Sequence, residues 1–447
     1  MVMKKTLLSF VCLAAMAWAA KAQAPAAAGA MTLRECMRYA VSHSTKMRIR
    51  QAASDDAQLD RRDAALALFT PQINASTYAY YNFGRSIDPQ TNTYFHTTSF
   101  HNNYGISAGY DLFNGFQAVN NYRISRTGMQ IAASQEKQAE ADICLAVMEA
   151  YYNTVYSQRL CAVCEEQAAV AEAALNKAQR QEELGQKSHA DVIQLEADLA
   201  DRRYELIQMR NRLADQKMTL ADLMFWPVDE DLVLDPTVPV LNAEPLDPDG
   251  VAAFALAHDP SMQIASMQEL NARRELQTAQ WQLLPTLSLY AGWNTSYYSY
   301  EGSQTARFRD QLRNNGGEYV ELALTFPIWG RLGRQSRVAR RQHALDKASA
   351  ELEQTRREVE SEVRRAVRDR DGSAAAYLQA QRKAAVQSEA YRLQLKQMEQ
   401  GLISPLEFQT ARNNYLRAVA DELNALFTCL IKQAVVSYYS GIEYIEQ

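Results

Sequence analysis

The chain lacks any hydrophobic run long enough to cross a bilayer as a helix. Its longest apolar stretch, Leu7 to Ala17, has about a dozen residues, whereas a spanning helix needs about 20. Basic residues precede this stretch, and Ala20-Lys21-Ala22 is a small-x-small sequence, so residues 1–22 are expected to be an export signal. Any passage through a membrane must then use β-strands that close into a barrel.

Cysteine and histidine are scarce, with six of each in 447 residues. Five cysteines remain outside the expected signal, and an odd number is a poor disulfide framework. Cys161 and Cys164 lie three apart in a helical pattern, which favours small buried residues over a redox motif. The histidines show no metal-ligand spacing, and no phosphate loop or nucleophile motif occurs. We therefore predict no enzyme activity, no metal and no cofactor.

Basic residues are not in excess, because the formal net charge is −5 and removal of the signal makes it more negative. Proteins that bind nucleic acids usually carry a patch of basic residues, so this composition disfavours a nucleic-acid partner.

Proline is missing between Pro89 and Pro227 and again between Pro327 and Pro405. Helical patterns fill these gaps, from about 116 to 184 and from about 332 to 400, and each could span roughly 100 Å. A lone helix of that length cannot bury an apolar stripe, so coiled-coil packing is expected. A heptad seam follows the first helix, at Val192, Leu195, Leu199, Arg202, Leu206, Met209, Leu213, Gln216, Leu220 and Leu223. A shorter seam follows the second helix, at Leu416, Val419, Leu423, Leu426 and Leu430.

The sequence repeats itself at an offset of about 215 residues. The segment around His43 matches the segment around His258, and each runs on to a proline, Pro71 or Pro285. We expect a first repeat over 23–226, a linker over 227–249 and a second repeat over 250–447. Each repeat contains a helix, two strands and a long helical hairpin.

Four segments alternate apolar with polar or small residues, as barrel strands do. They cover about 72–83, 103–113, 286–299 and 318–329. Long polar loops, about Gly84 to Asn102 and Tyr300 to Gly317, separate the paired strands. Four strands cannot close a transmembrane barrel, because the smallest have eight. The barrel must be shared, and two or three chains would both suffice.

Each helical hairpin has a tip of the form G-x-x-S-x-x-[D/E]. The glycine can end one helix in a left-handed conformation, and the serine can cap the next. Asp191 and Glu407 stand at the third helical position, where they close a capping box. The second tip is also apolar, at Leu402 and Ile403, which suggests a docking point.

These features together resemble the TolC-like outer-membrane efflux protein family. The resemblance covers the chain beyond the expected signal: the duplicated element order, the strand entries at Pro71 and Pro285, the corner Asp111-Leu-Phe-Asn-Gly115, and both tips. It implies a mainly α fold with a membrane β-barrel, in which long coiled-coil hairpins form a periplasmic α-barrel. It also implies a homotrimer with a twelve-stranded barrel in outer-membrane lipid.

The resemblance further implies that the tips dock a periplasmic adaptor protein, which links the channel to an inner-membrane transporter. The docking residues would be Gly185, Gln186, Lys187, Ser188, Gly401, Leu402, Ile403 and Ser404. The best-known members carry two carboxylates after the second glycine, at the periplasmic entrance. Here the first of these positions holds Glu407, but the second holds Thr410. The first repeat has Asp191 at the matching first position, so only half of the expected carboxylates are present at the entrance.

The predicted function is a passive exit duct of a tripartite export system, for small molecules or secreted proteins. A periplasmic coiled-coil scaffold is the alternative, and the amphipathic strands argue against it. If the chain is an exit duct, we expect it in the outer membrane, with a helical extension into the periplasm.

Overall fold

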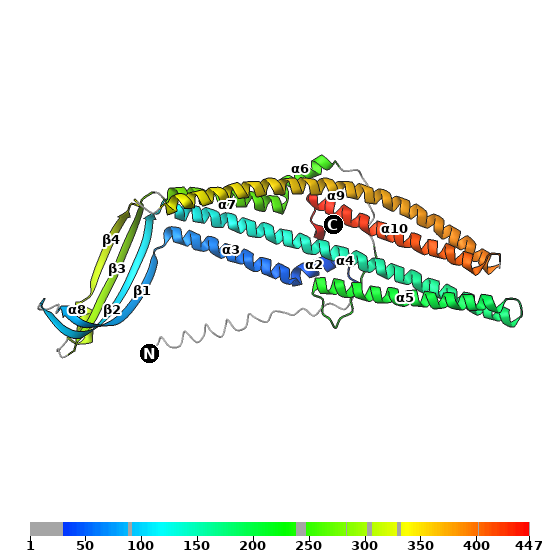
Figure 1. The fold of residues 1–447 in the computed structure, drawn as a ribbon, viewed down its shortest axis with the longest axis horizontal. Helices are drawn as coiled ribbons and strands as arrows, with labels where there is room; N and C mark the ends of the chain where they lie inside the picture. Colours follow the sequence, from blue (N-terminus) through cyan, green and yellow to red (C-terminus); the bar gives the residue numbers. More distant parts are fainter. Residues whose placement is uncertain are drawn as a thin grey trace, which may run out of the picture. The chain divides into compact units, whose positions relative to one another are not determined.

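The computed structural model describes residues 30–87, 92–237, 247–282, 284–301, 306–328, 332–400 and 402–446. The chain divides into two compact units. Figure 1 labels the helices and strands from which they are built. The first comprises Met1–Ser42, Ala146–Asn242 and Ala380–Phe427, and the second His43–Leu145, Ala243–Gln379 and Thr428–Gln447. The expected export signal lies outside the described residues. Within the described ranges, no helix combines the length and apolar character needed to cross a membrane.

The same order of elements occurs twice along the chain. The first series is α2 (Leu33–His43), α3 (Thr45–Phe69), β1 (Gln72–Ile87), β2 (Tyr94–Phe113), α4 (Gln117–Glu183) and α5 (His189–Met224). The second is α6 (Pro248–His258), α7 (Pro260–Trp281), β3 (Thr286–Tyr300), α8 (Phe308–Asn314), β4 (Gly317–Thr325), α9 (Gly333–Glu399) and α10 (Pro405–Tyr439), followed by a short 3₁₀ turn, Tyr444–Glu446. Both long helices, α4 and α9, have 67 residues, and both short helices, α2 and α6, have 11.

The short helices end at the two histidines that match between the repeats. His258 closes α6, where its Nδ1 lies 3.0 Å from the carbonyl oxygen of Phe254 and its ring stacks on the Phe254 ring at 4.2 Å. Asp259 then caps α7 by accepting a hydrogen bond from the backbone N–H of Ser261. The break between α6 and α7 is thus specified by local capping, whereas Ser44 at the start of α3 makes no side-chain capping bond.

The four strands form one antiparallel sheet in the order β1-β2-β3-β4. Strands β1 and β3 begin where the alternation begins, at Gln72 and Thr286. The first hairpin is longer than expected, because Tyr94–Asn102 continues β2 and pairs with the end of β1. Most of the segment expected to be a loop is therefore strand. Strand β4 is shorter than expected and ends at Thr325.

The register gives the sheet one apolar and one polar face. Successive side chains point to opposite faces, so residues paired across strands share a face. On the apolar face, one row of residues paired across the four strands is Ala75, Ile106, Trp293 and Glu318, of which only Glu318 is charged. Another row on the same face contains Ala108, Ala291 and Val320. The opposite face carries Asn74, Ser76, Ser107, Asp111, Ser288, Asn294, Glu321 and Ala323.

Helix α8 closes the part of β3 that β4 leaves unpaired. The side-chain amide of Gln311 accepts from the Tyr298 N–H (3.0 Å) and donates to the Tyr298 carbonyl oxygen (2.9 Å). It therefore makes the two hydrogen bonds that a neighbouring strand would make. The Phe308 ring packs against the rings of Tyr104 and Tyr297 on the apolar face. This short helix was not predicted.

The long helices pack through apolar stripes. In the first unit, Ala171, Leu175 and Ala178 of α4 pack with Val192, Leu195 and Leu199 of α5. The α5 seam buries Arg202 and Leu220 as well, but Leu223 is exposed and Met224 is buried in its place. In α10 the predicted seam residues Leu423 and Leu430 are buried, whereas Leu416, Val419 and Leu426 are half-buried. The other buried residues of α10 are mainly small or aromatic: Phe408, Ala411, Arg412, Ala418, Phe427, Cys429, Ala434 and Val436.

Candidate functional site

The first hairpin tip joins α4 to α5. Gly185 has a positive φ of 69°, and its N–H donates to the carbonyl oxygen of Glu182, while the N–H of Gln186 donates to that of Gln181. These two bonds are the Schellman ending of a helix. Ser188 then caps α5 by accepting from the backbone N–H of Asp191 at 3.2 Å. Lys187 is half-buried between these two capping residues.

The second tip joins α9 to α10 and shares one backbone hydrogen bond with the first tip. The N–H of Leu402 donates to the carbonyl oxygen of Gln397, which matches the bond at Gln186 in the first tip. Ser404 and Glu407 form a reciprocal capping box: each side chain accepts from the other's backbone N–H at 3.2 Å. Gly401 lies outside the described residues.

The apolar residues of the second tip differ in exposure. Leu402 is 69% exposed, whereas Ile403 is half-buried. We expected both to face outward, and only Leu402 does so fully. The first tip also presents a leucine, because Leu184 is 72% exposed.

The expected entrance residues follow each tip by about one turn. Glu407 and Thr410 are exposed on α10, and Asp191 is half-buried on α5. The Thr410 hydroxyl donates to the carbonyl oxygen of Leu406. Glu407 holds the capping box and also presents a carboxylate to solvent, so capping and an electrostatic role are compatible.

A buried ion pair just above the tips was not predicted. Arg412 of α10 is 1% exposed, and both of its terminal nitrogens contact the carboxylate of Asp198 on α5, one of them at 2.7 Å. Arg202 approaches the same carboxylate at 3.6 Å from the next turn of α5. The Phe408 ring lies 5.7 Å from the Arg412 guanidinium. This ion pair ties the two hairpins together within the first unit.

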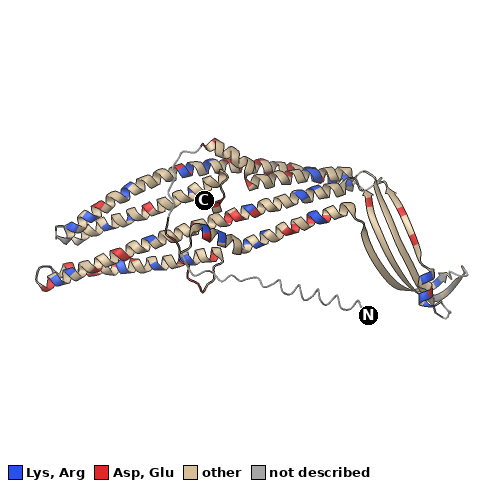
Figure 2. Cartoon of the chain, turned by 180° about the vertical axis from the view of Figure 1, so that it is seen from behind, with Lys and Arg blue, Asp and Glu red and all other residues tan. Residues whose placement is uncertain are grey.

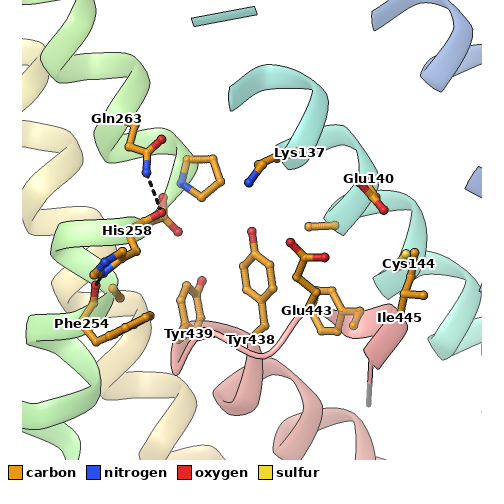
Figure 3. A pocket seen from close by; sticks show the side chains of 16 residues that line it. Lys137, Glu140, Cys144, Phe254, His258, Gln263, Tyr438, Tyr439, Glu443 and Ile445 are labelled. Carbon is orange, nitrogen blue, oxygen red and sulfur yellow. Dashed lines mark hydrogen bonds between the residues drawn. The ribbon is translucent and has the colours of Figure 1, made fainter. Parts of the chain in front are cut away.

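A cavity of about 290 Å³ lies in the second unit, between α4, α6 and the end of α10 (Figure 3). Tyrosine rings and the carboxylates of Glu140 and Glu443 line it, and Lys137 points toward its centre. Burial raises the pKa of Tyr438 to about 12, and nearby carboxylates add to the effect. Burial, together with Glu443 and Glu136, also raises the pKa of Glu140. These residues come from segments up to about 300 positions apart, so the cavity could not be predicted from local sequence patterns.

The comparisons with known proteins agree with this geometry. The model of the family described as outer membrane efflux protein matches residues 44–224 and 252–436. A search of curated proteins finds no match. Among solved structures, the chain is similar to CusC, with 15% identity, a TM-score of 0.74 and 91% of each chain covered.

Two further channels have the same fold. The Campylobacter jejuni CmeC outer membrane channel has 15% identity and a TM-score of 0.76, over 93% of this chain and 85% of that one. The open-state Neisseria gonorrhoeae MtrE outer membrane channel has 16% identity and a TM-score of 0.73, over 93% and 88%. Channels of this TolC-like type are trimers. With two family matches that together span most of its length, this chain belongs to the outer membrane efflux protein family, as a non-enzymatic outer-membrane efflux channel with a periplasmic helical extension.

Proposed function

We propose that three copies of this chain form the passive exit duct of a tripartite export system. The two-faced sheet carries the proposal. An apolar face suits lipid and a polar face suits a water-filled lumen, which is the pattern of membrane barrels. In the described residues β1 and β4 each pair on one side only, so both edges are available to a neighbouring copy. Unpaired edges are costly in lipid, and closure with two further sheets removes them.

The helical hairpins would carry the duct across the periplasm toward its partners. In this proposal a periplasmic adaptor docks on the tips, at Gly185, Gln186, Lys187 and Ser188 and at Gly401, Leu402, Ile403 and Ser404. The exposed Leu402 and Leu184 support a docking role, since capping does not require apolar side chains there. Energy for transport would come from an inner-membrane transporter that the adaptor connects to the duct.

Assembly and conduction test the first part of the proposal. Native mass measurement in detergent should give a trimer, and the trimer should conduct ions in planar bilayers. A monomer without conductance, released from cells without detergent, would instead favour the periplasmic scaffold.

Tip docking has a separate test. Gly401→Glu places a charge in an apolar contact, so adaptor crosslinking and export should both be lost. The tip is remote in sequence from the strands, so the amount of trimer in the outer membrane should not change. A photocrosslinker at Leu402 should capture the adaptor, and one at the exposed Arg356 in the middle of α9 should not. Full export by Gly401→Glu would remove the tip from the docking surface.

A further inference from the structure

The four-stranded stretch of the sheet has few charges, and all of them are acidic. Where β4 pairs with Thr286–Asn294 of β3, the described strands carry three charged side chains, Asp111, Glu318 and Glu321. Figure 2 shows the strands largely free of charge, with Lys and Arg gathered at the end of the sheet that carries α8. This four-stranded stretch, where β1 and β3 begin and β2 and β4 end, therefore has no described basic side chain to balance its acids.

The register separates the two glutamates of β4. Glu318 pairs with Trp293 and lies on the apolar face. Glu321 pairs with Tyr290 and lies on the polar face, which also carries Asp111. Two identical side chains three residues apart thus belong to opposite faces of one strand.

Glu321 differs from Asp111 in its surroundings. The Asp111 carboxylate accepts a hydrogen bond from the Ser288 hydroxyl at 2.6 Å. The Glu321 side chain is exposed and makes no hydrogen bond or ion pair with any described residue. Its charge is therefore free to act on solutes beside the polar face.

The rings of Tyr290 and Tyr319 lie beside Glu321 on the polar face of the sheet. The Tyr290 ring is 3.2 Å from the position that a Cβ on Gly109 would take, and the Tyr319 ring is 2.7 Å from that position on Gly292. Each ring therefore lies over a glycine of the neighbouring strand. Rings held this way leave the Glu321 carboxylate open to the space beside the sheet, and their faces also attract cations.

We propose that Glu321 is a charge-selectivity residue of the duct, where three copies form an acidic ring that favours cations over anions. This rests on the proposed function, because it requires the polar face to line the lumen of a trimer. Rings of acidic side chains give pores cation preference, and a low-dielectric wall strengthens their field. The ring stands in the strand region and is additional to Glu407, which follows the tip at the start of α10.

Reversal potentials of single trimers across a KCl gradient test the proposal. Glu321→Gln should lower the cation-to-anion permeability ratio by about twofold or more at about 0.01 M salt, where screening is weak. Glu321→Lys should lower it further. The difference from wild type should shrink at about 1 M salt, where charges are screened within about 3 Å. Glu318→Gln is the matched control, and its ratio should equal that of wild type.

The outcomes separate this inference from the proposed function. A wild-type trimer that does not conduct would reject the duct itself. A conducting trimer whose permeability ratio is unchanged by Glu321→Gln and Glu321→Lys would reject the selectivity role and leave the duct intact. Equal effects of Glu318→Gln and Glu321→Gln would also overturn it, because the assigned faces would not matter.

Discussion

Arg412 and Asp198 form a two-pronged ion pair between helices that lie 214 positions apart in the sequence. Both side chains are shielded from water, and the arginine is almost fully buried. Bidentate arginine–carboxylate pairs are geometrically specific, so this contact fixes the height of α10 against α5 as well as their separation.

Arg412→Met should destabilise the protein by about 3 kcal/mol, because it leaves the Asp198 carboxylate shielded from water without its main partner. Thermal unfolding of the purified protein measures the loss. Arg417→Met, at an exposed position of the same helix, is the control and should have little effect. The double variant Arg412→Met/Asp198→Leu should recover part of the stability, since it removes both charges of the pair while Arg202 keeps its ion pair with Glu205. Equal stability of Arg412→Met and the control would show that the ion pair contributes nothing.

Leu322→Arg should impair assembly of the trimer in the outer membrane. The register places Leu322 opposite Leu289 on the apolar face, and a cation facing lipid costs about 2–4 kcal/mol near the midplane. Ala323 pairs with Ser288 on the polar face, so Ala323→Arg should assemble. Quantifying trimer in membrane fractions compares the two variants. Equal assembly of both would mean that the faces are assigned wrongly.

Gly292→Ala should destabilise the sheet by about 1–3 kcal/mol through overpacking. A Cβ at this position would lie 2.7 Å from the Tyr319 ring and 2.9 Å from the carbonyl oxygen of Ile106. Gly105→Ala is a matched control on the adjacent strand, because its Cβ would meet the Ser76 hydroxyl at an ordinary 3.6 Å. Resistance of the trimer to heat in detergent distinguishes the two, and a Gly292→Ala trimer as resistant as the control would contradict the packing described.

Glu140→Gln should stabilise the protein at neutral pH. Burial raises the pKa of the Glu140 carboxyl, and Glu443 and Glu136 raise it further, with Lys137 acting in the opposite sense. The folded chain therefore retains a proton that the unfolded chain releases, so stability falls as pH rises from about 4.3 through the folded pKa. Unfolding temperatures measured between about pH 4 and 7 should fall less steeply for Glu140→Gln than for wild type. Glu149→Gln, exposed on the same helix, should follow wild type.

The long helices were predictable almost to the residue. The patterns expected over about 116–184 and 332–400 correspond to α4 (Gln117–Glu183) and α9 (Gly333–Glu399). Their ends are encoded locally, because the tip glycines, the capping serines and the absence of proline act within a few residues. The capping at Ser188 and Ser404 was predictable for the same reason.

Features that depend on partners distant in sequence were not predictable. The strand over Tyr94–Asn102 was not predicted because this segment is mostly polar and does not alternate. Its pairing with β1 makes it part of the sheet. Helix α8 is too short for its periodicity to stand out, and it depends on the hydrogen bonds of Gln311 to β3. The Arg412–Asp198 pair has no local signal, since a charged residue at a helix position ordinarily predicts solvent.

In the proposed duct, the equal lengths of α4 and α9 set how far the two hairpins would extend into the periplasm. At 1.5 Å per residue, removing seven residues from one helix shortens it by about 10 Å and keeps its heptad phase. The returning helix would need the same deletion, and so would the other hairpin if both tips are to reach the same level. Matched deletions would therefore give a family of shorter ducts, each suited to a narrower spacing between two membranes, whereas a deletion in one hairpin would give uneven tips.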